Sequence, residues 1–403
     1  DKRVFILGLG NLGKLYATCL AQLSRPPPIT LVVHRRSLLE QWAANPGIEM
    51  TRHGTTHRFE ADLDLEWWTT QRPTIGPVRE AGVRVDGGDP CGGGHIANLI
   101  VATKAAQALP EVDKLRRYLD ASSSILFVQN GMSRLWPPHG PTYCAWRWPD
   151  GNHPTFLHGI TTHGVYTEGP FKSVHAAPAD VVIGTVCPRT QHHHQEDTSS
   201  DDDGASHLIK LITNAPHLAG RSVSRRELWV LQLEKLVVNT IINPLTALLR
   251  VRNGELFTFA GQPSTKDTRM IAKIMDKLLV ETSACLQALI QHESSHEILV
   301  THQDSSSSSS SLQIRALLDR FSVPKLHELL YTVGAKVKYN KSSMLQDVEA
   351  GKPTEVREFN GWLVDTGAVV LGEEASQQQL AGHRLLIELV EKGAVLSEEA
   401  LGK

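Results

Sequence analysis

The sequence lacks most of the features that would set it apart from ordinary globular proteins. Its five cysteines (Cys19, Cys91, Cys144, Cys187 and Cys285) are odd in number and scattered, with no CxxC pair, so neither a disulfide framework nor a zinc site is indicated. No uninterrupted apolar run approaches about 18 residues, so we expect no membrane span. A formal net charge of −2 gives no global basic field and argues against nucleic acid as the main partner. A reducing compartment fits best.

A glycine-rich turn lies near the start of the chain. The apolar run of residues 3–9 leads into GLGNLG, after which apolar residues recur at helical spacing as far as Leu23. In a strand-turn-helix unit, Gly8 would permit the tight turn, Gly10 the approach of a pyrophosphate, and Gly13 the packing of helix on strand. The N-terminus of the helix would offer N–H groups to the phosphates. The pattern is weak alone, but its position at a strand-to-helix turn favours dinucleotide binding.

The next expected strand, residues 29–34, ends in Arg35 and Arg36. An NAD-binding protein usually carries an acidic residue there, which would repel the 2′-phosphate of NADPH, whereas a guanidinium group can bind that phosphate. This favours NADPH over NADH. The alternative is a solvated pair of charges after a strand.

The sequence pattern of an α/β protein continues, with expected strands at 98–103, 124–128, 156–163 and 180–185. Lys104 and Asn130 follow two of these strands. Ligands in open α/β sheets lie beyond the carboxyl ends of the strands, so both side chains are well placed to contact cofactor or substrate. Asn130-Gly131 alone would more often mark a turn.

Residues 235–255, KLVVNTIINPLTALLRVRNGE, place Lys235, Asn239 and Asn243 four residues apart within an apolar segment. On a helix they form one polar stripe, and buried polar groups need partners from the protein or from a ligand. Pro244 removes the N–H that would bond the carbonyl of Thr240, so we expect a kink there. A solvated helix face is the alternative.

Three breaks interrupt the pattern, at residues 51–94, 188–206 and 291–311. We interpret the first as a partly structured insertion, the second as a mobile loop and the third, which ends in seven serines, as a disordered loop. The histidines 192–194 and aspartates 201–203 make a metal site conceivable, although such a polar run more often forms a surface loop.

The C-terminal half is expected to be helical, with helices at 225–249, 268–290 and 312–318, near Met344 and Glu355, and around 382–392. Ser343 with Gln346 three residues later fits a capping box, which would explain Ser343 structurally. Glu355 could favour the start of a helix or face a cleft.

Together these stretches resemble the ketopantoate reductase (2-dehydropantoate 2-reductase) family. The matching motifs are GLGNLG at 8–13, ATK at 102–104, QNGM at 129–132, TTHG at 161–164, ELW, KLVVNTIINPLTAL and NGEL within 227–256, and SSMLQD, TE and NG within 342–361. They cover nearly the whole chain in the family's order, and KxxxNxxxNPLTA is the specific one. This chain departs from the family's pattern in its three breaks and its extra length. These differences concern the partners and the oligomeric state more than the chemistry.

The resemblance implies an α/β Rossmann-type domain at 1–221 and an all-α domain at 222–403 of the 6-phosphogluconate dehydrogenase C-terminal kind, with the active site between them. It implies that Lys235 is the general acid and that Glu355 takes part in catalysis and in binding. Ketopantoate would be held by Asn130, Asn239, Asn243 and Ser343. The cofactor-binding residues would be Gly8, Leu9, Gly10, Asn11, Leu12, Gly13, Arg35, Lys104, Asn130 and Glu355, with no metal.

The implied reaction is NADPH-dependent reduction of 2-dehydropantoate to pantoate, as in coenzyme A biosynthesis. The alternatives are a related reductase of another 2-keto acid, and an idle reductase fold used as an organellar binding protein. We expect a small-molecule 2-keto acid as the partner, with a homodimer left open, and a cytoplasmic location. Because the chain starts at Asp1 inside a strand pattern, a preceding targeting segment and a mitochondrial location stay open.

Overall fold

The structure, a computed structural model, describes residues 2–61, 63–69, 83–85, 95–188, 203–257, 266–299 and 307–396. The chain divides into two compact units. The α/β unit comprises residues 1–130 and 142–228, and the helical unit comprises residues 131–141 and 229–403. An α/β dinucleotide-binding fold followed by an all-α C-terminal part is thereby confirmed.

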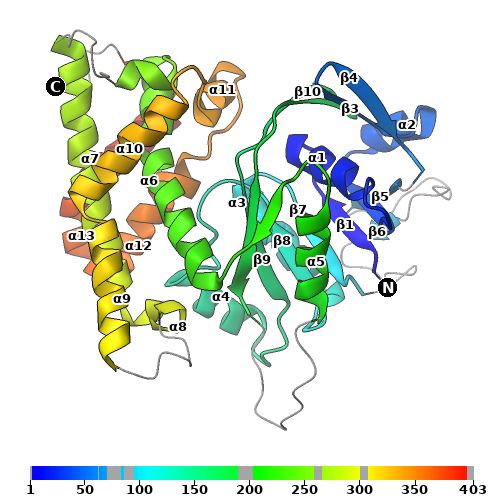
Figure 1. The fold of residues 1–403 in the computed structure, drawn as a ribbon, viewed down its shortest axis with the longest axis horizontal. Helices are drawn as coiled ribbons and strands as arrows, with labels where there is room; N and C mark the ends of the chain where they lie inside the picture. Colours follow the sequence, from blue (N-terminus) through cyan, green and yellow to red (C-terminus); the bar gives the residue numbers. More distant parts are fainter. Residues whose placement is uncertain are drawn as a thin grey trace. The chain divides into compact units, whose positions relative to one another are not determined.

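A nine-stranded sheet forms the centre of the α/β unit, in the order β13-β12-β9-β8-β7-β1-β2-β5-β6 (Figure 1). Neighbouring strands are parallel except for the antiparallel pair β9 and β12. The bounds are β1 Val4–Leu7, β2 Ile29–Val33, β5 Leu63–Thr69, β6 Val83–Val85, β7 Asn98–Val101, β8 Ser124–Phe127, β9 Thr155–Thr161, β12 Val181–Cys187 and β13 Gly220–Ser222. The strand order reverses its direction of growth at β1, where ligands bind in such sheets.

A second sheet has the order β10-β11-β3-β4 and lies beside the first helix (Figure 1). Its strands are β3 Ile48–Arg52, β4 Thr55–Phe59, β10 Gly164–Gly169 and β11 Lys172–Ala177. The helical segments of this part are α1 Asn11–Leu20, α2 Arg36–Ala44, α3 Ala105–Leu115, η1 Arg116–Tyr118, α4 His139–Arg147, which starts in the helical unit, and α5 Asp203–Asn214.

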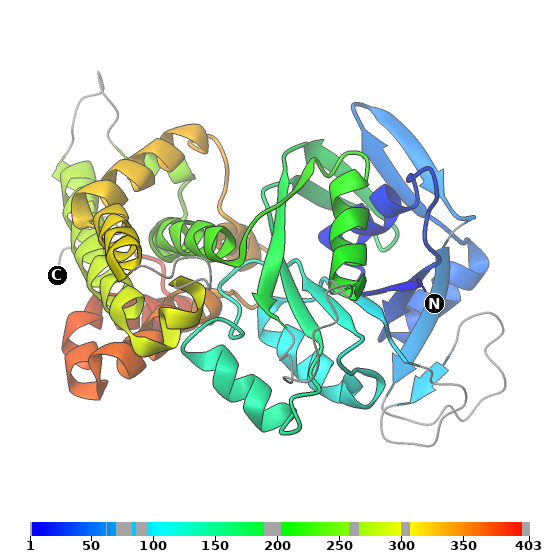
Figure 2. The ribbon, with the colours of Figure 1, turned by 60° about the horizontal axis from the view of Figure 1, so that its bottom comes forward.

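The large sheet is buried on both faces, as a doubly wound sheet requires (Figure 1, Figure 2). On one face Leu126 and Leu157 join a core made with apolar residues of α1 and α5. On the other face Phe127 and Phe156 contact one another, and Trp148 after α4 packs on Phe156. Neighbouring residues thus alternate between the two cores, which is the two-residue period of a strand.

The second unit is built from helices (Figure 2). Helix α6 begins in the last residues of the α/β unit and contains Pro244, and α12 packs against α7. The elements are α6 Arg225–Leu249, η2 Asn253–Leu256, α7 Lys266–Gln291, η3 Glu293–Ser295, α8 His296–Leu299, α9 Ser307–Arg320, α10 Val323–Lys336, α11 Ser343–Glu349, the π-helical turn η4 Arg357–Gly361, α12 Trp362–Leu371, α13 Glu373–Gln379 and α14 Ala381–Glu391. Within the described residues, no helix is long and apolar enough to cross a membrane.

Two of the expected breaks are more regular than their sequences indicate. The segment 51–94 contributes strands to both sheets, because β5 and β6 extend the large sheet and β4 pairs with β3. The serine run was expected to be disordered, yet α9 begins at Ser307 inside it, and η3 and α8 precede it. The histidines 192–194 lie outside the described residues, as do residues 201 and 202, while α5 begins at Asp203.

Candidate active site

The glycine turn connects β1 to α1 within a few residues. Gly8 has a φ of +99°, and a Cβ there would lie 2.9 Å from the backbone of Ala102. A Cβ on Gly13 would lie 2.0 Å from the carbonyl oxygen of Gly8. At Gly10, by contrast, the nearest heavy atom would be 3.9 Å away. The first and third glycines are therefore required by close packing, and the second leaves the backbone open to approach.

The N-terminus of α1 fits a phosphate group. Gly10 is the N-cap residue, and no side chain caps this end of the helix. The first N–H groups of a helix have no partner inside the helix, and the dipole favours an anion beside them. Asn11 is held at this end because the Ser173 hydroxyl donates a hydrogen bond of 3.2 Å to its Oδ1. The turn and the helix end thus present donors where the pyrophosphate of a dinucleotide would lie.

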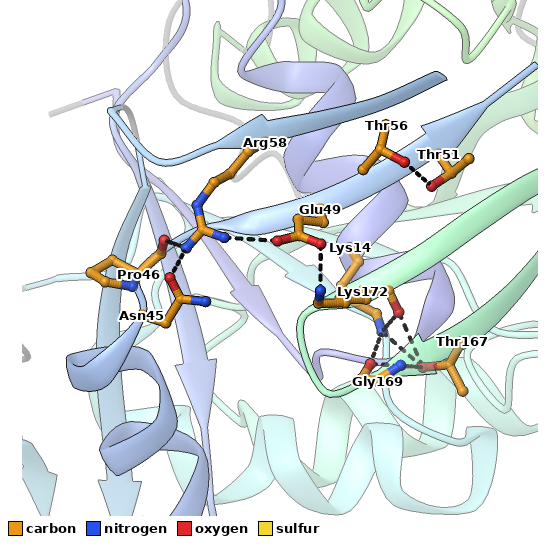
Figure 3. Close-up of polar contacts among 10 residues, drawn as sticks. All are labelled: Lys14, Asn45, Pro46, Glu49, Thr51, Thr56, Arg58, Thr167, Gly169 and Lys172. Atoms are coloured by element: carbon orange, nitrogen blue, oxygen red, sulfur yellow. Dashed lines mark hydrogen bonds and ion pairs between the residues drawn. The ribbon is translucent and has the colours of Figure 1, made fainter. Parts of the chain in front are cut away.

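Lys14, one residue beyond the turn, links α1 to the hairpin of β10 and β11 (Figure 3). Its side chain is buried, and Nζ donates to Thr167 Oγ1 at 3.2 Å and to the carbonyl oxygens of Gly169 at 3.0 Å and Lys172 at 3.1 Å. Burial lowers the pKa of Lys14 to about 8. Sequence reasoning missed this anchor, although a lysine on the apolar face of the helix was a visible signal.

The hairpin is itself fixed to β3. Lys172 pairs with Glu49 at 2.7 Å, and Arg58 of β4 bonds the same carboxylate at 2.8 Å (Figure 3). The hydrogen bond from Lys172 is the main reason why the pKa of Glu49 is lowered. The glycine turn, α1 and the small sheet are therefore one connected structure.

Three predicted cofactor or substrate residues lie at the carboxyl edge of the large sheet. Arg35 follows β2, Lys104 follows β7 and Asn130 follows β8, and these strands flank β1 on both sides in parallel register. Arg35 is exposed, and no carboxylate among the described residues pairs with it, whereas Arg36 pairs with Glu40 at 3.0 Å. The edge thus gathers a glycine turn, two cationic side chains and an amide, although their roles stay predictions.

In the helical unit, α6 carries the predicted polar stripe. Asn243 is buried and Asn239 is partly exposed, as is Lys235. Loss of hydration inside the unit lowers the pKa of Lys235 to about 8, while the charge of Glu355 raises it. Glu355 is itself buried and lies just ahead of η4, so the carboxylate that interacts with Lys235 comes from another segment. A lysine of this kind can hold a proton at neutral pH and release it readily.

Asn360 completes the hydrogen bonding of α6 at Pro244. Its Nδ2 donates to the Thr240 carbonyl oxygen at 2.8 Å, which is the acceptor that Pro244 leaves without an N–H donor. The helix therefore continues through the proline. The sequence showed the missing donor, but nothing in it identified Asn360 as the replacement.

The capping-box prediction at Ser343 was wrong. The N-cap of α11 is Ser342, whose hydroxyl accepts from the Leu345 N–H at 3.0 Å and lies 2.7 Å from Thr246 Oγ1 of α6. The helix thus begins one residue earlier than the motif implied. Ser343 is the first residue of α11 and does not cap it.

Comparison with known proteins agrees with this arrangement. The family described as ketopantoate reductase PanE/ApbA matches residues 4–187, and its C-terminal part matches residues 227–372. The chain belongs to this family. The family consists of oxidoreductases that act on 2-keto acids.

Within the ketopantoate reductase family, two relatives match almost the whole chain. "Ketoisovalerate reductase BEA2" of Gibberella fujikuroi is 44% identical over 97% of this chain and 84% of its own length. "Ketoisovalerate reductase" of Beauveria bassiana is 38% identical over 100% of this chain and 85% of its own length. A "probable 2-dehydropantoate 2-reductase" of Schizosaccharomyces pombe is 32% identical over 67% of each chain.

Solved structures share the fold at low sequence identity. A probable 2-dehydropantoate 2-reductase from Bacillus subtilis has a TM-score of 0.57 at 22% identity and covers 95% of this chain and 99% of its own. D-mandelate dehydrogenase, solved with NADH and anilino(oxo)acetate, has a TM-score of 0.59 at 14% identity and covers 100% of both chains. At these identities the likeness supports the fold alone.

Proposed function

We propose that this protein is an NADPH-dependent reductase of a branched 2-keto acid, with 2-ketoisovalerate ahead of 2-dehydropantoate as the substrate. The observation that carries this proposal is the share of the chain that aligns with each relative. The two ketoisovalerate reductases align with 97% and 100% of the chain, whereas the Schizosaccharomyces pombe relative aligns with 67%. We propose residues 1–221 as the NADP-binding domain and residues 222–403 as the substrate domain.

The two substrates differ by one polar group. Both are 2-keto acids with a branched carbon beside the carbonyl, but on that carbon 2-dehydropantoate carries a hydroxymethyl group, with its distal hydroxyl, where 2-ketoisovalerate has a hydrogen. A site built to bond that hydroxyl would leave a buried polar group without its partner when 2-ketoisovalerate binds, and discrimination of this kind can be strong. The ratio of the two activities is therefore a direct test of the site.

Lys235 is the proposed proton donor. A bound reduced nicotinamide cofactor would supply the hydride to the keto carbon, and negative charge then develops on the carbonyl oxygen. An ammonium group within hydrogen-bond reach stabilises that oxygen and protonates it. The lowered pKa of Lys235, about 8, makes the proton easier to transfer than from an ordinary lysine.

The neighbouring residues orient the substrate and hold the lysine ready. Asn239 and Asn243 share the face of α6 with Lys235 and would donate hydrogen bonds without adding charge. Ser343 is the proposed contact for the substrate carboxylate, with Asn130 as a further donor. The charge of Glu355 counteracts the loss of hydration at Lys235 and so favours its protonated form.

Cofactor binding is assigned to the α/β unit. The open backbone at Gly10 and the uncapped end of α1, at Asn11, Leu12 and Gly13, suit the pyrophosphate. Gly8 and Leu9 complete the turn. Arg35 is the proposed contact for the 2′-phosphate, and Lys104 for the other phosphates.

The test is the steady-state rate of NADPH oxidation with each 2-keto acid. We expect kcat/KM for 2-ketoisovalerate to exceed that for 2-dehydropantoate by at least about tenfold, or about 1.4 kcal/mol, because a pocket shaped for 2-ketoisovalerate has no room and no hydrogen-bond partner for the extra hydroxymethyl group. A preference for 2-dehydropantoate would instead support pantoate formation. Tight NADPH binding without turnover of any 2-keto acid would favour the idle, binding-protein alternative.

A further inference from the structure

Two cysteines and a histidine from separate segments of the α/β unit meet at one point. Cys144 lies in α4, His153 in the loop that follows, and Cys187 at the end of β12. The two sulfur atoms are 3.4 Å apart, and the three potential ligand atoms all lie within 4.8 Å of one another. None of the three belongs to the glycine turn or to the α6 stripe. Their spacing in the sequence gave no sign of the cluster.

The distances suit ligands around one ion. Zinc binds sulfur at about 2.3 Å and imidazole nitrogen at about 2.0–2.1 Å, so tetrahedral geometry separates two bound sulfurs by roughly 3.7 Å. A disulfide needs sulfurs about 2.05 Å apart. We propose that Cys144, His153 and Cys187 form a zinc site with three protein ligands that joins α4 to the end of β12.

One ring nitrogen of His153 is held by a hydrogen bond to the backbone. His153 Nδ1 lies 2.8 Å from the carbonyl oxygen of Pro154, so Nδ1 carries the proton and donates it, and the lone pair lies on Nε2. The ring stacks on Phe156 with the planes 13° apart. Ligating histidines are commonly fixed in this way, by a hydrogen bond from the second ring nitrogen to a backbone carbonyl.

The cluster supplies three protein ligands and leaves the fourth position to solvent. Cys144 and His153 are 5% and 4% exposed, whereas Cys187 is partly exposed, so water can supply the fourth ligand. Arg225 donates to the Val186 carbonyl oxygen at 2.8 Å, next to Cys187. Without a metal, the hydrogen bond with Cys187 and burial raise the pKa of the Cys144 thiol, and the charge of Arg225 opposes this rise only in part. On binding, each thiol would release one proton to solvent, and two thiolates would balance the charge of Zn²⁺.

Cobalt is the probe of choice, because Co²⁺ bound to thiolates absorbs by sulfur-to-metal charge transfer. The full-length chain, without an added histidine tag, is reduced, freed of metal with a chelator and titrated with Co²⁺. We expect one Co²⁺ per chain with a charge-transfer band, its displacement by Zn²⁺, and a rise in Tm with either metal.

Variants identify the ligands. C144S and C187S should each weaken or abolish the charge-transfer band, and H153Q should lower Co²⁺ affinity at least about tenfold. The matched control is C285S, because Cys285 is a buried thiol of the helical unit that lies 3.4 Å from the carbonyl oxygen of Leu363. A second control replaces the histidines 192–194 with glutamine, since these can bind cobalt without a thiolate band.

Two outcomes would overturn the proposal. One is a charge-transfer band that survives in both C144S and C187S. The other is a reduced protein that takes up no Co²⁺ or Zn²⁺ while its oxidised form contains a Cys144 to Cys187 disulfide in a peptide map. That second result would make the pair a redox couple.

Discussion

At the scale of single residues, the charge on Lys235 decides between a chemical and a structural role. A lysine whose pKa is lowered by loss of hydration has no reason to be kept charged for stability alone, since a charge inside the protein costs free energy. A proton donor, in contrast, works best with a pKa near the pH of the reaction.

Lys235→Ala should lower kcat by roughly 10²–10⁴-fold, the usual contribution of a general acid. The measurement is kcat with saturating NADPH and 2-ketoisovalerate. NADPH affinity and Tm should change little, and these are the controls. A changed Tm with normal activity per folded molecule would mean that Lys235 is a structural residue.

The pH profile gives an independent reading of the same group. The acid must be protonated, so kcat should fall as pH rises through about 8. Because the charge of Glu355 raises the pKa of Lys235, Glu355→Gln should move this alkaline limb to lower pH. An unmoved limb in the Glu355 variant, or a limb that persists in Lys235→Ala, would contradict the assignment.

Arg35→Asp should reverse the cofactor preference. The wild-type protein is expected to bind NADPH at least about tenfold more tightly than NADH, because a guanidinium group binds the 2′-phosphate and a carboxylate repels it. Arg36→Ala is the matched control, since Arg36 already pairs with Glu40. Dissociation constants from fluorescence titration measure the effect. Equal affinities in the wild type would refute the NADPH assignment.

At the scale of secondary-structure elements, α6 depends on a side chain more than a hundred residues away. The Asn360 amide replaces the N–H that Pro244 lacks, and its Nδ2 also lies 3.0 Å from His383 Nδ1. One amide therefore ties η4 to both α6 and α14.

Asn360→Leu should destabilise the protein by about 1–3 kcal/mol, because it leaves the buried Thr240 carbonyl without a donor. In a Pro244→Ala background the same change should cost less, since alanine restores the helical N–H. Urea unfolding of the four proteins in this cycle measures the coupling. If the two changes in the free energy of unfolding were additive, the Asn360 bond to Thr240 would not compensate for the N–H that Pro244 lacks.

Motifs and periodic patterns that extend over many residues could be predicted from the sequence, whereas short or exposed segments could not. The glycine turn and the α6 stripe follow from helical spacing and turn chemistry. Strand β4 was missed because nearly all its side chains are exposed and none alternates with a core residue. Helix α9 was predicted only over 312–318, and its start at Ser307 was missed because serine runs resemble loops, although packing against α7 can hold such a helix.

Contacts between residues that are far apart in the sequence could not be predicted either. The Cys144 and Cys187 pair, the Lys14 anchor and the Asn360 bond join segments that no local pattern connects. Ser342 and Ser343 differ by one position, and only the geometry of α11 distinguishes the capping residue from its neighbour. Helix and strand ends are set by such tertiary contacts.

At the scale of the whole molecule, buried neutral histidines occur in both units. Burial lowers the pKa of His175 in the small sheet and of His383 in the helical unit to about 4 in each case. In the helical unit, Asn360 Nδ2 donates to His383 Nδ1, so a proton on that nitrogen would oppose another donor. Both folded units therefore disfavour charged histidine.

Stability should fall as pH drops from about 6.5 towards 4. In that window the unfolded histidines bind protons and the folded ones do not, so proton binding lowers the free energy of the unfolded state and the free energy of unfolding falls. For His383 the loss at pH 5 should be roughly 2 kcal/mol. Urea unfolding at pH 7.5 and pH 5 measures it, and an equal free energy of unfolding at both values would contradict this account.

The bonds of Lys14 also bear on how the chain acquires its function during synthesis. The glycine turn leaves the ribosome well before the hairpin, because the carbonyl groups that hold Lys14 belong to residues 155 and 158 positions later. Domains fold as they emerge, and contacts across such separations form late. The nascent protein would therefore carry its complete glycine turn through much of translation without the hairpin that fixes it. Competence to bind a dinucleotide would then begin only after Lys172 has emerged.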